Sequence, residues 1–481
     1  MGGNININTR ILQLNNGNIN ASTSTAQKGG DINVNASESV EVIGGGFEKL
    51  QENIIIPAFD GEPVAVDGFP GISKLANPKG DENSLTLDNF ETGIVTASDG
   101  AGSSGNILIQ TPNFKASNGG LIATTTLDKG EGGNITVNAD NILEIDNSLL
   151  GTGTFTEKPS GNINLSASKL IAIGGAQVLT TTFDKGRAGN LTVNADSIDL
   201  IDPSLQGFTS GLFATSFQNA SGDGGDINIK TRDFNIVDRA AVSVSGEGEG
   251  NAGDIDIEAI KIFLDNSSIT ATSISGEGGN INLTIADFLL LRNNSTISTR
   301  AGTETSGGGN GGNIIFNGGF IVALPSENSD INANAFQGNG GNITIATPGI
   351  FGITFRDGNT SNSDITASSE FGIDGNFTLD LTAVNPENGL IELTENLTDA
   401  SDQIAAGCPT DEEARFITTG RGGIPRNPKQ PLQNEIVLQD LRTISSPSSP
   451  SSSSPPSSPR HLLQPRGPRQ RSGSSTPSRG R

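Results

Sequence analysis

Apolar and polar residues alternate along most of this chain in short stretches that return at a regular interval. After Asn134 the sequence reads Ile-Thr-Val-Asn-Ala, after Asn162 Ile-Asn-Leu-Ser-Ala, and after Asn190 Leu-Thr-Val-Asn-Ala. In a β-strand, such alternation sends the apolar residues to one side and the polar residues to the other. We therefore predict a strand with one buried face after each of these asparagines.

A glycine followed by Asn or Asp and then an apolar residue marks the start of each unit. From Asn106 onward, successive units are 28, 28, 28, 36, 28, 26, 33, 29 and 34 residues apart. The Asn or Asp positions are Asn4, Asn18, Asp31, Asn106, Asn134, Asn162, Asn190, Asp226, Asp254, Asn280, Asn313, Asn342 and Asn376. A period sustained over this many units indicates a repeat architecture.

Each unit contains two further short stretches that predict strands. The first is apolar, and we expect it to form one column from Ile142, Leu170 and Ile198 and another from Ile145, Ile173 and Ile201. The second is rich in Thr, as in 124–126 and 180–182, which lie two repeats apart. Three short strands per unit, joined by Gly/Asn/Asp turns, predict one coil of a right-handed parallel β-helix (a β-solenoid) of about 28–30 residues per coil.

The Gly-Asn pair of each unit is expected at a tight corner of the coil. Gly and Asn tolerate positive φ best, so we predict that conformation there. Asn side chains stacked at about 4.8 Å, the spacing of adjacent coils, can form a hydrogen-bonded ladder along the β-helix.

Departures from the period define the expected domain organisation. Residues 1–43 and 101–383 are assigned to coils, and residues 44–100, with four prolines between 57 and 78, to an excursion or loop-rich insertion. Residues 384–442 are assigned to a cap-like segment that covers the open end of the β-helix. Residues 443–481, dominated by Ser, Pro and Arg, are expected to be a disordered tail.

Composition excludes several classes of protein. The chain of 481 residues has 64 Gly, no Trp or Tyr, one Cys, one His and a formal net charge of −24. One Cys forms no internal disulfide, so Cys408 either pairs between chains or is buried in the cap-like segment. The acidic balance argues against nucleic acid as a partner. The sequence contains no apolar run of the roughly 20 residues that a transmembrane helix needs.

Parallel β-helices include pectate lyase-like enzymes, so a polysaccharide-active enzyme is the alternative function. Its best candidates are Asp226, Asp254 and Asp256, which could stack on one face. These carboxylates alternate with Asn at corner positions, however, and the chain lacks both Trp or Tyr for sugar stacking and a His outside the tail. The segment 221–226 resembles a Gly-Asp calcium repeat without its nine-residue period. We therefore predict no enzyme activity and no catalytic, cofactor or metal site.

The repeats and the segment after them resemble the filamentous-haemagglutinin-like proteins of cyanobacteria. The repeats contribute Gly-Gly-Asn-Ile, Thr-Thr-Thr and Ile-Asp-Asn-Ser. The more specific signal is an ordered C-terminal set: Asn388-Gly-Leu-Ile-Glu-Leu393, Glu395-Asn-Leu397, Gly407-Cys-Pro409, Arg415-Phe416 and Thr419-Gly-Arg-Gly-Gly-Ile-Pro425.

The resemblance implies a non-enzymatic, adhesin-like protein that is secreted or exposed on the cell surface. Members of this family leave the cell by two-partner secretion, so the implied partners are an outer-membrane transporter and the glycans or proteins of host or neighbouring cells. The family also has a signal peptide and an N-terminal secretion domain. Because Met1 to Ile5 already lie within a repeat, we expect this chain to correspond to the C-terminal part of such a protein.

Overall fold

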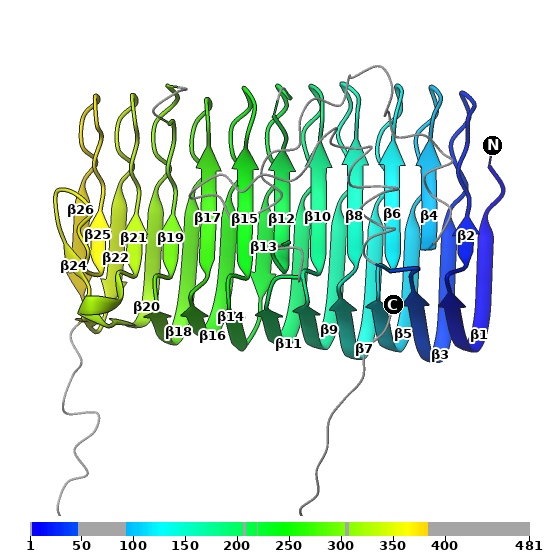
Figure 1. Ribbon diagram of the computed structural model, residues 1–481, viewed down its shortest axis with the longest axis horizontal. Coiled ribbons are helices and arrows are strands. Elements are labelled where there is room, and N and C mark those ends of the chain that lie inside the picture. The colour runs from blue at the N-terminus through cyan, green and yellow to red at the C-terminus, as the bar shows by residue number, and fades with distance from the viewer. Residues whose placement is uncertain (1, 47–92, 205–207, 219, 304–306, 383–481) are drawn as a thin grey trace, which may run out of the picture. The chain divides into compact units, whose positions relative to one another are not determined.

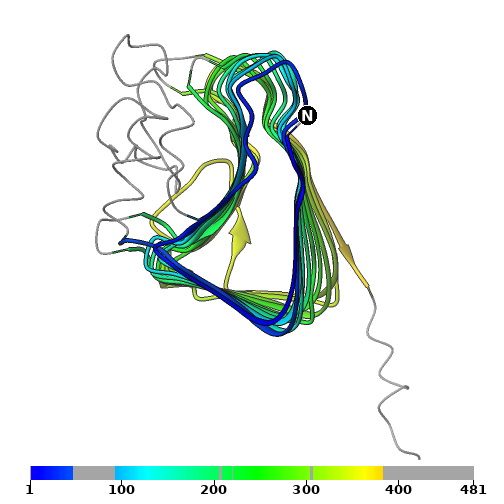
Figure 2. The ribbon, with the colours of Figure 1, turned by 90° about the vertical axis from the view of Figure 1, so that its right-hand side faces the viewer.

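The computed structural model describes residues 2–46, 93–204, 208–218, 220–303 and 307–382. These residues form a parallel β-helix whose successive coils stack from one end to the other, as predicted (Figure 1). Seen along its axis from the N-terminal end, the coils superpose and wind clockwise away from the viewer, which is the right-handed sense (Figure 2).

Two sheets make up the coils. Sheet A has 14 strands and sheet B has 12, and every pairing between neighbouring strands is parallel. The strands of sheet A are β1 (Ile5–Asn15), β3 (Ile32–Ile43), β5 (Ile107–Ser117), β7 (Ile135–Asp146), β9 (Ile163–Ile173), β11 (Leu191–Ile201), β13 (Ile227–Lys230), β14 (Asp233–Val237), β16 (Ile255–Asp265), β18 (Ile281–Arg292), β20 (Ile314–Ala323), β22 (Ile343–Thr347), β23 (Ile350–Phe351) and β26 (Phe377–Leu381).

The strands of sheet B are shorter and alternate with those of sheet A along the chain. They are β2 (Asn18–Asn20), β4 (Gly93–Ser98), β6 (Leu121–Thr126), β8 (Leu149–Thr154), β10 (Gln177–Thr182), β12 (Gly211–Ser216), β15 (Ala241–Gly246), β17 (Ser268–Ser273), β19 (Thr296–Ser298), β21 (Asp330–Asn332), β24 (Thr354–Phe355) and β25 (Asp364–Thr366). A 3-10 helix, η3 (Pro325–Glu327), follows β20.

Most coils contain two strands rather than the three expected from the sequence. In most coils the first two predicted strands are one continuous strand of sheet A that bends in the middle. They stay separate in two coils, as β13 and β14 and as β22 and β23. The bend is a β-bulge in several strands, because the register shifts there between neighbours. The third predicted strand, rich in Thr, is the strand of sheet B.

Because of this bulge, the predicted apolar columns are only partly correct. In β7 it holds one extra residue, so Leu143 rather than Ile142 pairs with Leu170, and Ile142 is 41% exposed. Leu170 does pair with Ile198 as predicted. The second expected column is wrong for the same reason: Ile145 pairs with Ala172 and is buried, whereas Ile173 pairs with Ile201, and both are only partly buried.

The corner glycines are required by close packing and not by positive φ, contrary to the prediction. Gly133 and Gly161 lie outside the left-handed region, but a Cβ on Gly161 would come within 1.7 Å of the carbonyl oxygen of Gly133 in the preceding coil. Positive φ is found instead at the corner between the sheets, for example at Asn118 (52°) and Asn147 (49°). The chain therefore uses Asn as a left-handed turn residue at one corner and as a ladder at another.

The predicted asparagine ladder is present. The backbone N–H of each corner residue donates to the side-chain oxygen of the corner residue one coil earlier, as from Asn162 to Asn134 and from Asn190 to Asn162, both at 2.8 Å. The ladder continues across the whole described β-helix, from the Asp31 N–H donating to Asn4 to the Asn376 N–H donating to Asn342.

The interior is apolar between the two sheets and polar where the cross-section narrows. Ile135, Val137 and Ala139 all point inward, as predicted, and are at most 2% exposed. The loops after sheet B form the narrow extension visible in Figure 2. Buried hydroxyls at its base bond to the corner glycines, as from Thr124 Oγ1 to the Gly133 carbonyl and from Thr180 Oγ1 to the Gly189 carbonyl, both at 2.5 Å.

The predicted excursion is shorter than 44–100. Residues 44–46 continue the coil, because the Gly44 N–H donates to the Ser117 carbonyl, and residues 93–98 form β4, which pairs with β2 and β6. The rest of the excursion, residues 47–92, lies outside the described residues. So do the cap-like segment 384–442, which contains Cys408, and the tail 443–481.

Candidate functional site

The outer surface of sheet A carries polar side chains in columns that run along the β-helix. Counting the corner Asn or Asp as the first residue of each unit, the third and fifth residues point outward, while the second and fourth are buried in all coils from β3 to β22. Parallel register places equivalent residues beside one another in successive coils. The third-residue column therefore runs Thr192, Asn228, Asp256, Asn282, and the fifth-residue column runs Asn194, Lys230, Glu258, Thr284.

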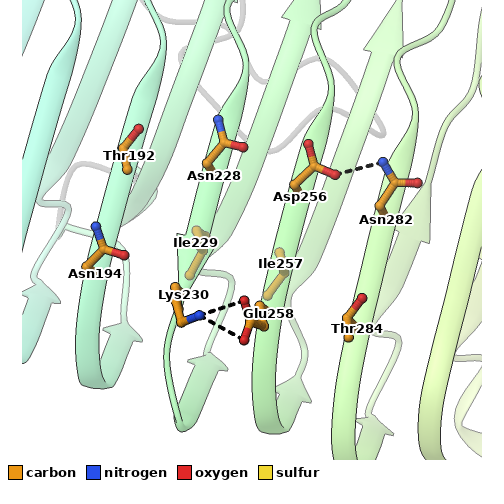
Figure 3. Close-up of a pocket in the computed structure, with 10 residues that line it drawn as sticks. All are labelled: Thr192, Asn194, Asn228, Ile229, Lys230, Asp256, Ile257, Glu258, Asn282 and Thr284. Carbon is orange, nitrogen blue, oxygen red and sulfur yellow. Dashed lines mark hydrogen bonds and ion pairs between the residues drawn. The ribbon is translucent and has the colours of Figure 1, made fainter.

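These two columns line a shallow depression of about 250 Å³ on β11, β13, β16 and β18 (Figure 3). Its floor includes Ile229 and Ile257, which are 3% and 2% exposed. Its walls are amides, hydroxyls and three charged side chains, Lys230, Asp256 and Glu258. Figure 3 shows these polar groups arranged in rows, each row on a neighbouring strand.

Two polar contacts between adjacent coils fix side chains in the depression. Lys230 Nζ lies 2.9 Å from both carboxylate oxygens of Glu258. Asn282 Nδ2 donates to Asp256 Oδ1 at 2.7 Å. Because Lys230 and Glu258 are each more than 60% exposed, their ion pair contributes at most about 1 kcal/mol to stability. Both charges therefore remain accessible to a ligand.

Apart from Asp256, sequence reasoning did not single out these residues, although a usable signal is present. Asp226-Ile-Asn-Ile-Lys230, Asp254-Ile-Asp-Ile-Glu258 and Asn280-Ile-Asn-Leu-Thr284 have the same polar and apolar pattern. An alignment of the units at the corner residue gives the outward positions directly. It does not give the depression, because the depth of a surface depends on how the sheet bends.

The three aspartates proposed for the alternative enzyme do not share one column. Asp226 and Asp254 are corner residues, and Asp226 Oδ1 accepts the Asp254 N–H at 3.1 Å and pairs with Arg187 at 2.7 Å. Asp256 lies on the outer face of sheet A, where it accepts the Asn282 amide. The stacking expected for the first two is confirmed, and the third belongs to the depression.

The carboxylates of the segment 221–226 also have a structural role. Asp223 accepts the Asn251 N–H at 2.9 Å, which repeats the ladder at a second position of the coil. Among the described residues, no group of three or more His, Cys, Asp or Glu is arranged to hold a metal ion.

Two carboxyl groups with raised pKa lie on the side of sheet B, away from the depression. Burial raises the pKa of Glu247, directly after β15, to about 8. Burial likewise raises the pKa of Asp330, in β21, to about 6. Asp330 accepts the Asp364 N–H at 2.9 Å, and Asp364 in turn pairs with Arg356 and accepts the Thr360 N–H and hydroxyl.

No protein-family model, curated protein or solved structure matches this chain. The part of the chain that the structure describes contains no helix long and apolar enough to cross a membrane. The polar surface of sheet A is therefore the feature that bears on function. Rows of hydrogen-bond donors and acceptors repeat about every 4.8 Å, which suits contact with an extended polar chain lying along the β-helix.

Proposed function

We propose that this protein is a non-enzymatic, adhesin-like β-helical protein that is secreted or exposed on the cell surface. The observation that supports the proposal is the pair of polar columns on sheet A, which present similar groups in coil after coil. A polymer with a repeating polar structure, such as a cell-surface glycan, can contact many coils at once.

The mechanism is multivalent contact on a stiff surface. A single exposed hydrogen bond contributes about 1 kcal/mol or less, which is too little for useful binding. Linked contacts act at high effective concentration, so their free energies combine. The register of sheet A fixes the side chains in advance and reduces the entropy lost on binding.

Export and localisation rest on the resemblance to filamentous-haemagglutinin-like proteins. In this proposal a two-partner-secretion transporter of the outer membrane exports the protein, and glycans or proteins of host or neighbouring cells are its ligands. The test for export is expression with and without a candidate transporter, followed by detection of the protein outside the cell. Equal amounts outside the cell in both cases would contradict the transporter's role.

The test for adhesion compares binding of the full chain with binding of a surface variant to whole cells and to immobilised polysaccharides. The variant carries Asn194→Ala, Asn228→Ala, Asn282→Ala and Thr284→Ala, all on outward positions of sheet A. The control carries Asp128→Ala and Lys129→Ala, on the exposed loop after β6. We expect at least a tenfold loss of binding for the surface variant and none for the control.

Two results would contradict the proposal. If the surface variant binds as well as the parent chain, sheet A is not the binding face. If the parent chain releases oligosaccharides from acidic polysaccharides, the protein is an enzyme of the pectate lyase-like kind. Circular dichroism of each variant establishes beforehand that the β-helix is intact.

A further inference from the structure

The outer face of sheet B differs from that of sheet A because it is buried and carries a cluster of apolar side chains among small polar ones. All six residues of β4, β6, β10, β12, β15 and β17 are buried, so both faces of these strands are shielded from solvent. The outward residues form a second apolar cluster, separate from the interior of the β-helix. Its members are Val95, Ala97, Leu121, Ala123, Leu179, Phe183, Phe208, Phe213, Phe217 and Ala241.

A row of stacked phenylalanines runs beside this face. Phe155, Phe183 and Phe217 each follow a strand of sheet B by one residue. The ring centroids of Phe155 and Phe183 are 4.1 Å apart and those of Phe183 and Phe217 4.8 Å, and both pairs are within 8° of parallel. Stacking at the spacing of the coils makes a continuous aromatic edge, which favours an apolar partner over water.

One short described loop covers part of this face. The short loop between β11 and β12 contributes Phe208, which is 5% exposed and held by a hydrogen bond from its N–H to Ser204 Oγ at 2.9 Å. Phe213 and Phe217, in and directly after β12, are buried as well. The apolar face extends much further, however, from Val95 in β4 to Ala241 in β15, which is about 24 Å along the β-helix.

The segment 47–92 is attached at the edge of this face. It leaves the coil after Gly46, just beyond β3, and rejoins it at Gly93, the first residue of β4. In the next coil, three residues suffice to connect β5 to β6. The coil itself therefore does not need the inserted segment, and both ends of the segment lie beside sheet B.

We propose that residues 47–92 dock on the outer face of sheet B and complete the second apolar cluster. Their sequence has suitable side chains, including the run Ile54-Ile-Ile56 and the phenylalanines Phe59, Phe69 and Phe90. An extended chain covers about 3.3 Å per residue, so the segment is long enough to reach the far strand and return. Tethering at both ends gives it a high effective concentration at this face, an advantage that a second copy of the chain lacks.

Photo-crosslinking in the full chain identifies the occupant. A benzophenone analogue of phenylalanine is placed at Thr181, an outward residue of β10, and separately at Leu149, an outward residue of β8. Asn194, on the outer face of sheet A, is the control position. After irradiation, mass spectrometry is expected to find intramolecular crosslinks to residues 47–92 from both test positions and none from the control.

Crosslinks to a second copy of the chain, crosslinks to residues 383–481, or no crosslink from either test position would overturn the proposal. A second measurement does not depend on the probe. A variant that joins Gly46 to Gly93 through Gly-Ser-Gly should bind an apolar dye several-fold more strongly than the parent chain, and Leu121→Thr with Leu179→Thr in that variant should reverse the increase. Equal dye binding by the parent and the deletion variant would also refute the docking.

Discussion

At the scale of single residues, one corner of each coil determines how the coils stack. The corner glycine has no side chain because the carbonyl of the preceding coil occupies the position of a Cβ. The residue after it offers a side-chain oxygen to the next coil. Glycine and asparagine therefore occur together at this corner. Glycine permits the close approach of two coils, and asparagine supplies the acceptor for a backbone N–H that would otherwise be unpaired.

Removing one oxygen of the ladder should weaken the stacking measurably. In Asn162→Ala the Asn190 N–H loses its acceptor at 2.8 Å. We expect the free energy of unfolding to fall by about 1 kcal/mol, the usual cost of one such hydrogen bond. Chemical denaturation followed by circular dichroism measures this, and Asn164→Ala, an exposed outward residue two positions later, is the matched control. A change in the control as large as in Asn162→Ala would rule out the ladder as the cause.

Glu247 should make stability depend on pH. Because burial holds its pKa in the folded protein near 8, above the usual 4.5, the folded chain keeps a proton that the unfolded chain has lost between these values. Stability therefore falls as pH rises from about 4.5 to 8 and then levels off. Glu247→Gln should remove this fall and be more stable than the parent at pH 8, by on the order of 2 kcal/mol, since the side chain keeps some solvent contact.

Thermal unfolding at several pH values tests this expectation. The exposed Glu249, two residues further on, provides the control Glu249→Gln, whose pH profile should match that of the parent. If Glu247→Gln has the same slope as the parent between pH 5 and 8, then Glu247 is not the group responsible.

At the scale of elements, the sequence predicts the coil better than its strands. The corner Asn or Asp and the alternation after it locate where sheet A begins in every coil from β5 onward, because both signals are local. The bend is not predictable in the same way. The bend contains one more residue in β7 than in β9, so Ile142 lies outside the apolar column that the repeat spacing predicts for it. The depression on sheet A was missed because it forms only when four strands lie side by side.

Deleting one coil should leave the fold intact. Removal of residues 135–162 joins Asn134 to Ile163, and Ile163 is the residue that pairs with Ile135. The new junction therefore keeps both the corner and the register, and each coil contacts only its neighbours. We expect cooperative unfolding with a Tm within about 5 °C of the parent. Removal of residues 135–148 alone, which joins a corner directly to a strand of sheet B, should abolish the cooperative transition.

At the scale of the whole molecule, unbalanced charge opposes the regular stacking. The chain has 53 acidic and 29 basic residues, and stacking places side chains of successive coils about 4.8 Å apart. Ion pairs between neighbouring coils, such as Arg10–Glu38 and Lys185–Glu157, offset only part of this repulsion because they are exposed. We therefore expect the repulsion among the excess acidic side chains to exceed the attraction within the ion pairs.

The melting temperature should accordingly rise with ionic strength. Between about 20 mM and about 500 mM NaCl the screening length falls from about 20 Å to about 4 Å, which removes repulsion between charges in distant coils more completely than attraction within close pairs. Scanning calorimetry of the full chain in NaCl and in tetramethylammonium chloride measures the shift, and similar shifts in the two salts identify screening rather than binding of a particular cation. A Tm that falls as salt is added would mean that the ion pairs between coils outweigh the excess of 24 negative charges.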